Sequence, residues 1–163
     1  EGDISGRFIG AMSYISKLTG EKYPKLDETA SKALAYQSAN GCYGKDQEPD
    51  GWDYWGRQLW GQGRILTGLA EYSMATGDLK AKESAEKLAQ YIISSIPRWD
   101  TTKTGEQWFP NYTNTLESMM LVYKLTKNPK YVKAGMQIAE FIPDFGVYHA
   151  HGYLIPGGFI KVA

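Results

Sequence analysis

Apolar side chains recur three and four positions apart through most of this chain, which is the spacing of one face of an α-helix. Six such stretches stand out, at residues 8–15, 30–34, 66–74, 85–96, 116–123 and 131–142. No segment sustains the strict alternation of apolar and polar residues that a half-buried strand shows. The pattern therefore predicts an all-α fold, with strands at most in short loop ribbons.

The connections within successive pairs of predicted helices are similar. Each of three segments contains a helix end, a small polar turn and a second helix: SKLTGEKYPKLDETASKAL, SMATGDLKAKESAEKLAQYI and YKLTKNPKYVKAGMQIAEFI. Gly20 and Gly77 suit the left-handed conformation that closes a helix, and Asn128 is the next-best residue for it. The pairs recur at roughly 50 to 57 residues, which indicates a repeat of αα-hairpins within a single domain, residues 1–163.

The links between the pairs are long and rich in Gly, Pro, Trp, Tyr and charged residues: NGCYGKDQEPDGWDYW, PRWDTTKTGEQWFPNYTN and PDFGVYHAHGYL. Long loops in a compact helical domain are more often functional than idle. If the pairs are antiparallel, the links emerge at the end of the array where the first helix of every pair begins. We therefore expect a polar and aromatic rim there, at the N-termini of these helices, which forms the wall of a cleft.

Composition narrows the possible partners. With 42% hydrophobic and 22% charged residues, the chain has the profile of a soluble globular domain. Its formal net charge of +0 gives no support to nucleic-acid binding, and no apolar run approaches the roughly 20 residues that cross a membrane. Cys42 is the single cysteine, which excludes an intrachain disulfide and a zinc site built from several cysteines. Five tryptophans and twelve tyrosines suit the wall of a wet cleft as well as a core.

Three segments carry a resemblance to a known family: GDISGRFIGAMSYISKLTGE, WGQGRILTGLAEYSMATGD and ESMMLVYKLTKNPKYVKAGMQIAEFI. They resemble the first half of the catalytic domain of the bacterial β-L-arabinofuranosidase family, which belongs to the six-hairpin glycoside hydrolases. The resemblance implies an (α/α)6 toroid with a sugar cleft at its centre and hydrolysis of glycosidic bonds in plant or microbial glycans. It also favours a periplasmic or extracellular location.

The resemblance covers only part of such a toroid. Three hairpins and the start of a fourth make about half a ring, and an open half-ring would expose the apolar flanks of its first and last hairpins. We therefore expect a fragment of a larger catalytic toroid, or a chain that associates with whatever completes the ring. In the family a zinc-bound cysteine from the later half is the nucleophile, so that role is not assigned to Cys42. No cofactor is predicted, and zinc is expected only if the missing half supplies ligands.

Five aromatic and amide residues are candidates for sugar binding. Trp52, Trp55 and Trp60 are suited to stack on sugar rings, or alternatively to pack the loop against the rim. Tyr112 and Asn114 precede the fifth predicted helix and are suited to hydrogen-bond sugar hydroxyls. The alternative for Asn114 is an N-cap.

Charged candidates stand at the starts of the third and fifth helices. Arg57 is suited to bind hydroxyls or a sugar carboxylate bidentately, or to form a salt bridge with Asp50 or Asp53. Glu117 and Asp53 are the candidate catalytic carboxylates, because glycoside hydrolysis generally requires a pair of carboxyl groups. Their structural alternatives are stabilisation of a helix N-terminus for Glu117 and N-capping for Asp53.

His149 and His151 are the only histidines and stand two apart in YHAHGY. In an extended segment both would point the same way, toward a substrate hydroxyl or a metal, and a metal site would need a third ligand from another loop. We predict substrate contact and no metal site.

Two other functions remain open from the sequence. One is a helical-repeat scaffold that binds a protein partner on its rim. The other is a toroid lyase that cleaves acidic polysaccharide by β-elimination, for which Arg57, the histidines and Tyr112 are better suited than paired carboxylates.

Overall fold

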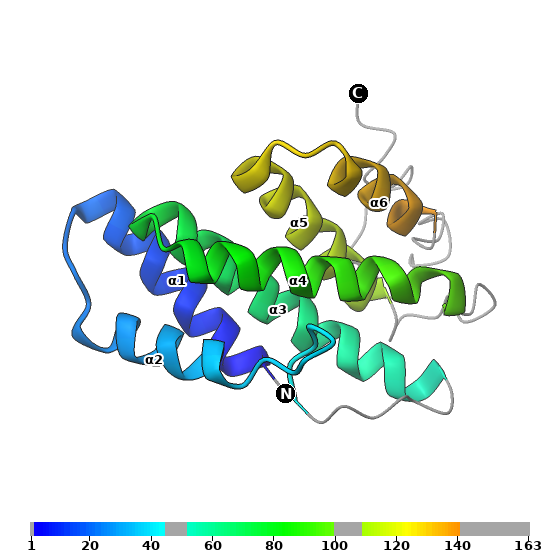
Figure 1. The fold of residues 1–163 in the computed structure, drawn as a ribbon, viewed down its shortest axis with the longest axis horizontal. Helices are drawn as coiled ribbons and strands as arrows, with labels where there is room; N and C mark the ends of the chain where they lie inside the picture. The colour runs from blue at the N-terminus through cyan, green and yellow to red at the C-terminus, as the bar shows by residue number, and fades with distance from the viewer. Residues whose placement is uncertain (1, 45–51, 100–108, 141–163) are drawn as a thin grey trace, which may run out of the picture.

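The computed structural model describes residues 2–44, 52–99 and 109–140, and these form an all-α fold (Figure 1). Its helices are α1 (Asp3–Thr19), α2 (Pro24–Ala35), α3 (Trp52–Thr76), α4 (Leu79–Ser95), the short 3₁₀ helix η1 (Ile96–Arg98), α5 (Phe109–Thr126) and α6 (Lys130–Ala139). Within these ranges the one β-type pairing is an isolated bridge between Gln37 and Tyr43. The predicted all-α fold of repeated hairpins is confirmed. None of these helices has an apolar stretch that would cross a bilayer.

The hairpins α1–α2, α3–α4 and α5–α6 stack side by side in two layers. The first helices of the three hairpins form what we call the inner layer, in which α3 packs extensively against α1 on one side and α5 on the other. The second helices, α2, α4 and α6, form the outer layer, and Figure 1 shows α4 crossing in front of α3. The core lies between the layers.

Glycines bring α1 and α3 into close contact. Gly2, Gly6 and Gly10 stand four residues apart, so they share one face of α1, and Gly68 of α3 packs against this face. A side chain at Gly6 would collide with the backbone of Arg64. Because Gly2 lies beside Gly61 while Gly10 lies beside Gly68, the contacts advance along both helices together, and the helices are parallel.

Polar side chains join α3 to α5. The Asn114 amide donates to the Trp60 carbonyl (2.9 Å), and the Ser118 hydroxyl donates to the Gly63 carbonyl (2.8 Å). Thr67 and Ser118 also share a hydrogen bond of 3.1 Å between their hydroxyls. The pairing again advances along both helices, so α1, α3 and α5 all begin at the same end of the array, as predicted.

The prediction of which α1 residues are buried is wrong. The sequence pattern pointed to Phe8, Ala11, Met12 and Ile15, but the helix buries Gly6, Ile9, Gly10 and Ser13. The reason is the close approach of α3, which requires small residues where a wider interface would take large apolar ones. Phe8 and Ala11 are exposed, and Met12 and Ile15 are only partly buried.

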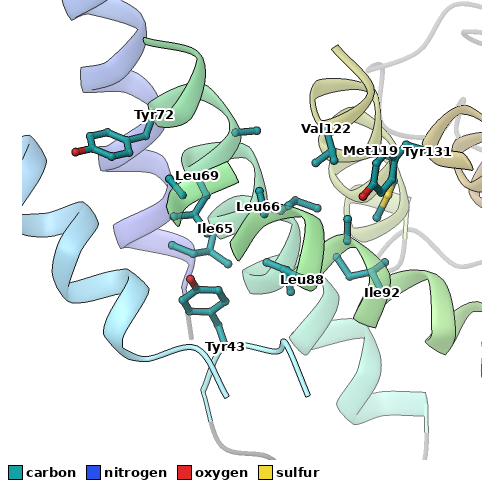
Figure 2. Close-up of a cluster of buried hydrophobic side chains, with 14 of the residues drawn as sticks. Tyr43, Ile65, Leu66, Leu69, Tyr72, Leu88, Ile92, Met119, Val122 and Tyr131 are labelled. Atoms are coloured by element: carbon teal, nitrogen blue, oxygen red, sulfur yellow. The ribbon is translucent and has the colours of Figure 1, made fainter. Parts of the chain in front are cut away.

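The stripes predicted for α3 and α4 form the centre of the core. Figure 2 shows large side chains from four helices meeting between the layers: Ile65, Leu66, Leu69, Leu88, Ile92, Met119, Val122 and Tyr131. Leu66, Leu69, Leu88 and Ile92 are fully buried. Each such side chain contributes about 1.5 to 3 kcal/mol through the hydrophobic effect, so this cluster holds the two layers together.

A threonine closes the first helix of every hairpin in the same way. The hydroxyls of Thr19, Thr76 and Thr126 each donate to the carbonyl four residues back, and each accepts the backbone N–H two residues ahead at 3.2 Å. The residue that follows each threonine has a positive φ: 75° at Gly20, 76° at Gly77 and 59° at Lys127.

The third turn differs from the sequence prediction. Asn128 was the expected left-handed residue, but Lys127 adopts that conformation. The reason is that in all three turns the left-handed residue directly follows the threonine. Asn128 instead accepts the Lys130 N–H with its side-chain oxygen, at 3.1 Å.

Candidate functional site

Several predicted site residues lie where the structure gives only their backbone position. Trp52, Asp53, Trp55 and Arg57 stand in the first two turns of α3, and Tyr112 stands in the first turn of α5. Their side chains are outside the part of the structure that is described. His149 and His151 lie outside the described residues altogether.

Asn114 is placed inside a helix rather than ahead of one. Because α5 begins at Phe109, Asn114 is not an N-cap. It is 3% exposed, and its Nδ2 donates to the Trp60 carbonyl of α3. Its Oδ1 is buried and has no hydrogen-bond partner. Glu117, three residues further along α5, is exposed.

Trp60 is the centre of a charged cluster between α1 and α3. The Arg7 guanidinium carbon lies 5.5 Å from the centroid of its ring, and that of Arg64 lies 4.7 Å away. These distances are typical of cation–π contacts. Arg7 also donates to the Asp3 carboxylate through Nε at 2.7 Å.

The carboxylate of this cluster is held in its ionised form. Partial burial raises the pKa of Asp3, but hydrogen bonds from Arg7 and Trp60 and the positive charges of Arg7 and Arg64 outweigh that effect. The net result is a pKa below the ordinary value. Asp3 therefore stays negatively charged at neutral pH and neutralises Arg7.

A groove of about 310 Å³ runs along the inner layer beside this cluster. Gly6 and Gly10, where α1 and α3 are closest, are among its lining residues. The other lining residues are Arg7, Ala11, Tyr14, Arg64, Thr67 and Glu71. The groove thus combines an aromatic ring, two guanidinium groups, a hydroxyl and a carboxylate on one surface.

Arg64 and Tyr14 are the groove residues with the most unused binding capacity. Arg64 forms no ion pair in the described part of the chain, and its buried Nε has no acceptor. Tyr14 is 54% exposed, so its ring is open to the groove. Trp60, by contrast, is partly buried and in contact with both guanidiniums.

Most residues of the groove were not predicted from the sequence, because the candidates were sought in the loops and at the helix starts. The usable signal was the helical period itself. Trp60, Arg64, Thr67 and Glu71 are spaced four, three and four residues apart, so they share one face of α3 over about 16 Å. Such a polar and aromatic stripe lies on α3 beside the stripe that is buried in the core, and it indicates a candidate binding face.

A larger hollow of about 610 Å³ lies at the opposite end of the array, between the first two hairpin turns. Both of its aspartates are engaged within the fold. Asp27 accepts the Tyr72 hydroxyl at 2.8 Å, and the Asp78 side chain caps α4 by accepting the Ala81 N–H at 2.9 Å. We take the groove on the inner layer as the candidate site, because it combines an aromatic ring with two guanidinium groups.

Tyr43, in the described segment that follows α2, is held by a buried polar network. Gln62 of α3 donates to the Tyr43 carbonyl at 2.7 Å and accepts the Tyr43 N–H at 3.0 Å. The Tyr43 hydroxyl is 2.8 Å from that of Ser84 on α4. Cys42, buried and unpaired with another cysteine, stands in this same segment. These contacts join Tyr43 to α3 and α4.

Comparison of the chain with known protein families, with curated proteins and with solved structures found no match. In the part of the chain that the structure describes, no three histidine, cysteine or acidic side chains are grouped so as to hold a metal ion.

Proposed function

We propose that this chain is the sugar-binding part of a carbohydrate-active enzyme, a glycoside hydrolase similar to the β-L-arabinofuranosidase family and about half of an (α/α)6 toroid. The groove of the inner layer is the observation that carries the proposal. An aromatic ring suits the C–H face of a sugar, while guanidinium, hydroxyl and carboxylate groups suit its hydroxyls. The parallel α1, α3 and α5 also present one common face, as the inner helices of a toroid do.

Hydrolysis requires a general acid and a second carboxylate. Asp3 is a poor general acid, because its neighbours keep it ionised. Glu117 and Asp53 remain the proposed catalytic carboxylates, and we add Glu71, which lines the groove itself. In this proposal the hairpins that complete the ring supply the remaining catalytic groups and any zinc.

A binding titration tests the sugar-site proposal. We expect oligosaccharides from a panel of neutral and acidic glycans to bind the chain, as measured by calorimetry. Tyr14→Ala removes the exposed ring and should weaken binding about fivefold or more. Tyr123→Ala, an aromatic truncation on α5 outside the groove, is the matched control and should have no effect. Failure of every glycan to bind, or equal effects of the two variants, would contradict the proposal.

The reaction type is tested separately on the intact protein. Hydrolysis releases new reducing ends and no unsaturated sugar, and Glu117→Gln or Glu71→Gln should abolish that release if either carboxylate is catalytic. A polysaccharide lyase instead yields an unsaturated uronate that absorbs ultraviolet light. Detection of that product would replace hydrolysis with β-elimination.

A protein-binding scaffold is the second candidate function, and one observation favours it. Ile4, Phe8, Ile15 and Leu18 share the side of α1 that faces away from its contact with α3, and Ile4 is 83% and Leu18 69% exposed. An apolar stripe of this kind is typical of a surface that another helix covers. In the toroid proposal that helix belongs to the hairpin that closes the ring, or to an associating chain.

A further inference from the structure

Two guanidinium groups lie at the Trp60 end of the groove, but they differ in their partners. Arg7 is neutralised by Asp3, at 2.7 Å between Nε and the carboxylate. Arg64 contacts the Trp60 ring and forms a salt bridge with none of the described carboxylates, and its buried Nε finds no acceptor. A buried donor without an acceptor is unfavourable, so the fold maintains this guanidinium at a free-energy cost.

The charges of the groove are therefore separated along its length. Asp3 is hydrogen-bonded to Arg7 and also interacts with the charge of Arg64, so two guanidinium groups and one carboxylate leave a net positive charge at this end. Glu71 lies on the same face of α3, seven residues or about 10 Å further along the helix. A ligand that complements this groove carries a negative group at the Arg64 end and hydroxyls beyond it, where Tyr14 lies.

We infer that Arg64 binds the carboxylate of an acidic sugar, so that the groove between α1 and α3 takes uronate-containing glycans in preference to neutral ones. The inference rests on the proposed sugar-binding function and specifies its substrate class. A planar guanidinium matches a carboxylate with two parallel hydrogen bonds, which the point charge of a lysine does not reproduce. Contact with the Trp60 ring holds the guanidinium in place for this role.

Calorimetric titration with a uronate trisaccharide and with its neutral counterpart of the same ring configuration tests the inference. The wild-type chain should bind the uronate form about tenfold more tightly or better. Arg64→Gln should weaken binding of the uronate about tenfold more than binding of the neutral sugar, and Arg64→Lys should restore only part of that difference. Lys80→Gln, the same charge change on α4 in the outer layer, should alter neither affinity. Thermal unfolding of each variant verifies that it is folded.

The outcomes separate this inference from the sugar-site proposal. Equal binding of the two sugars, or an equal loss for both in Arg64→Gln, overturns the uronate preference but leaves the sugar site standing. Absence of binding by either sugar overturns both. A sulfated neutral trisaccharide that binds as tightly as the uronate shows a general anion site and overturns the specificity for carboxylate.

Discussion

At the scale of single residues, the turn after α5 departs from the other two hairpin turns. All three use a threonine hydroxyl to join the helix end to the turn, but only the third places a residue with a side chain in the left-handed region, at Lys127. That conformation brings Cβ close to the backbone and costs about 1 to 2 kcal/mol outside glycine. This turn is therefore less stable than its two relatives.

Lys127→Gly should raise the free energy of unfolding by about 0.5 to 1 kcal/mol, because glycine adopts the turn without strain. The reverse change, Gly77→Lys, should lower it by a similar amount, since a Cβ at Gly77 meets no atom within 4 Å and only the backbone is affected. Urea denaturation of both variants measures this. A less stable Lys127→Gly would show that the Lys127 side chain has a role in the turn.

Two tyrosines should make the fold sensitive to alkaline pH. Burial, with the neighbouring Asp27 carboxylate, raises the pKa of Tyr72 to about 12, and burial, with Glu86, does the same for Tyr131. The folded state retains these protons where the unfolded state, with a pKa near 10, releases them. The stabilisation they provide is therefore complete below about pH 10 and is lost as pH rises toward about pH 12.

The double variant Tyr72→Phe and Tyr131→Phe should accordingly show a shallower loss of unfolding free energy above about pH 10 than the wild type. Tyr36→Phe changes an exposed tyrosine and is the control. The measurement is urea denaturation at several pH values across this range. Identical slopes for the wild type and the double variant would contradict the assigned pKa shifts.

At the scale of the helices, contact between α1 and α3 depends on individual glycines. A Cβ at Gly6 would collide with the Arg64 backbone, whereas one at Gly10 would lie 3.5 Å from the Gly68 Cα, an ordinary contact. The same substitution one turn apart should therefore have opposite effects. Gly6→Ala should lower the free energy of unfolding by about 2 kcal/mol or more, and Gly10→Ala should raise it by up to about 1 kcal/mol through helix propensity.

Thermal or urea unfolding of the two alanine variants tests this difference. Two variants of equal stability would show that α1 and α3 are farther apart than the structure places them.

The helices and their pairing could be predicted from sequence, but not every contact between them. The stripes of α3 and α4 were read correctly, because large residues such as Leu66 and Ile92 are buried wherever the helix packs. On α1 none of the periodic apolar residues is fully buried, because glycines form the face that packs on α3. Hydrophobic periodicity does not reveal a face made of glycines. The hydrogen bond from Asn114 to α3 was not predicted either, because it depends on how α3 and α5 are aligned, and these helices are distant in sequence.

The candidate site was predicted less completely than the fold. Trp60 was singled out, but its contacts with Arg7 and Arg64 arise only when α1 and α3 lie side by side. The two arginines are far apart in the chain, and no local motif joins them.

At the scale of the whole molecule, the apolar stripe of α1 leaves the array open on one flank. We expect the 163-residue chain to self-associate through this flank at high concentration. Ile4→Lys combined with Leu18→Lys should suppress that association with little change in stability, because both side chains are exposed. Leu79→Lys, which changes an equally exposed leucine on α4, is the control.

Sedimentation velocity over a range of concentrations measures the association. A chain that stays monomeric throughout, or that associates equally in the double variant, would show that the stripe is not a contact surface.

An NMR titration of the isotope-labelled chain with a uronate trisaccharide shows whether the groove between α1 and α3 binds a sugar. We predict chemical-shift changes at the Arg64 and Trp60 side-chain N–H groups and at the Gly10 and Thr67 amides, with little change in the outer layer. An absence of shifts, or shifts confined to the outer layer, would contradict the assignment of the groove as a sugar site.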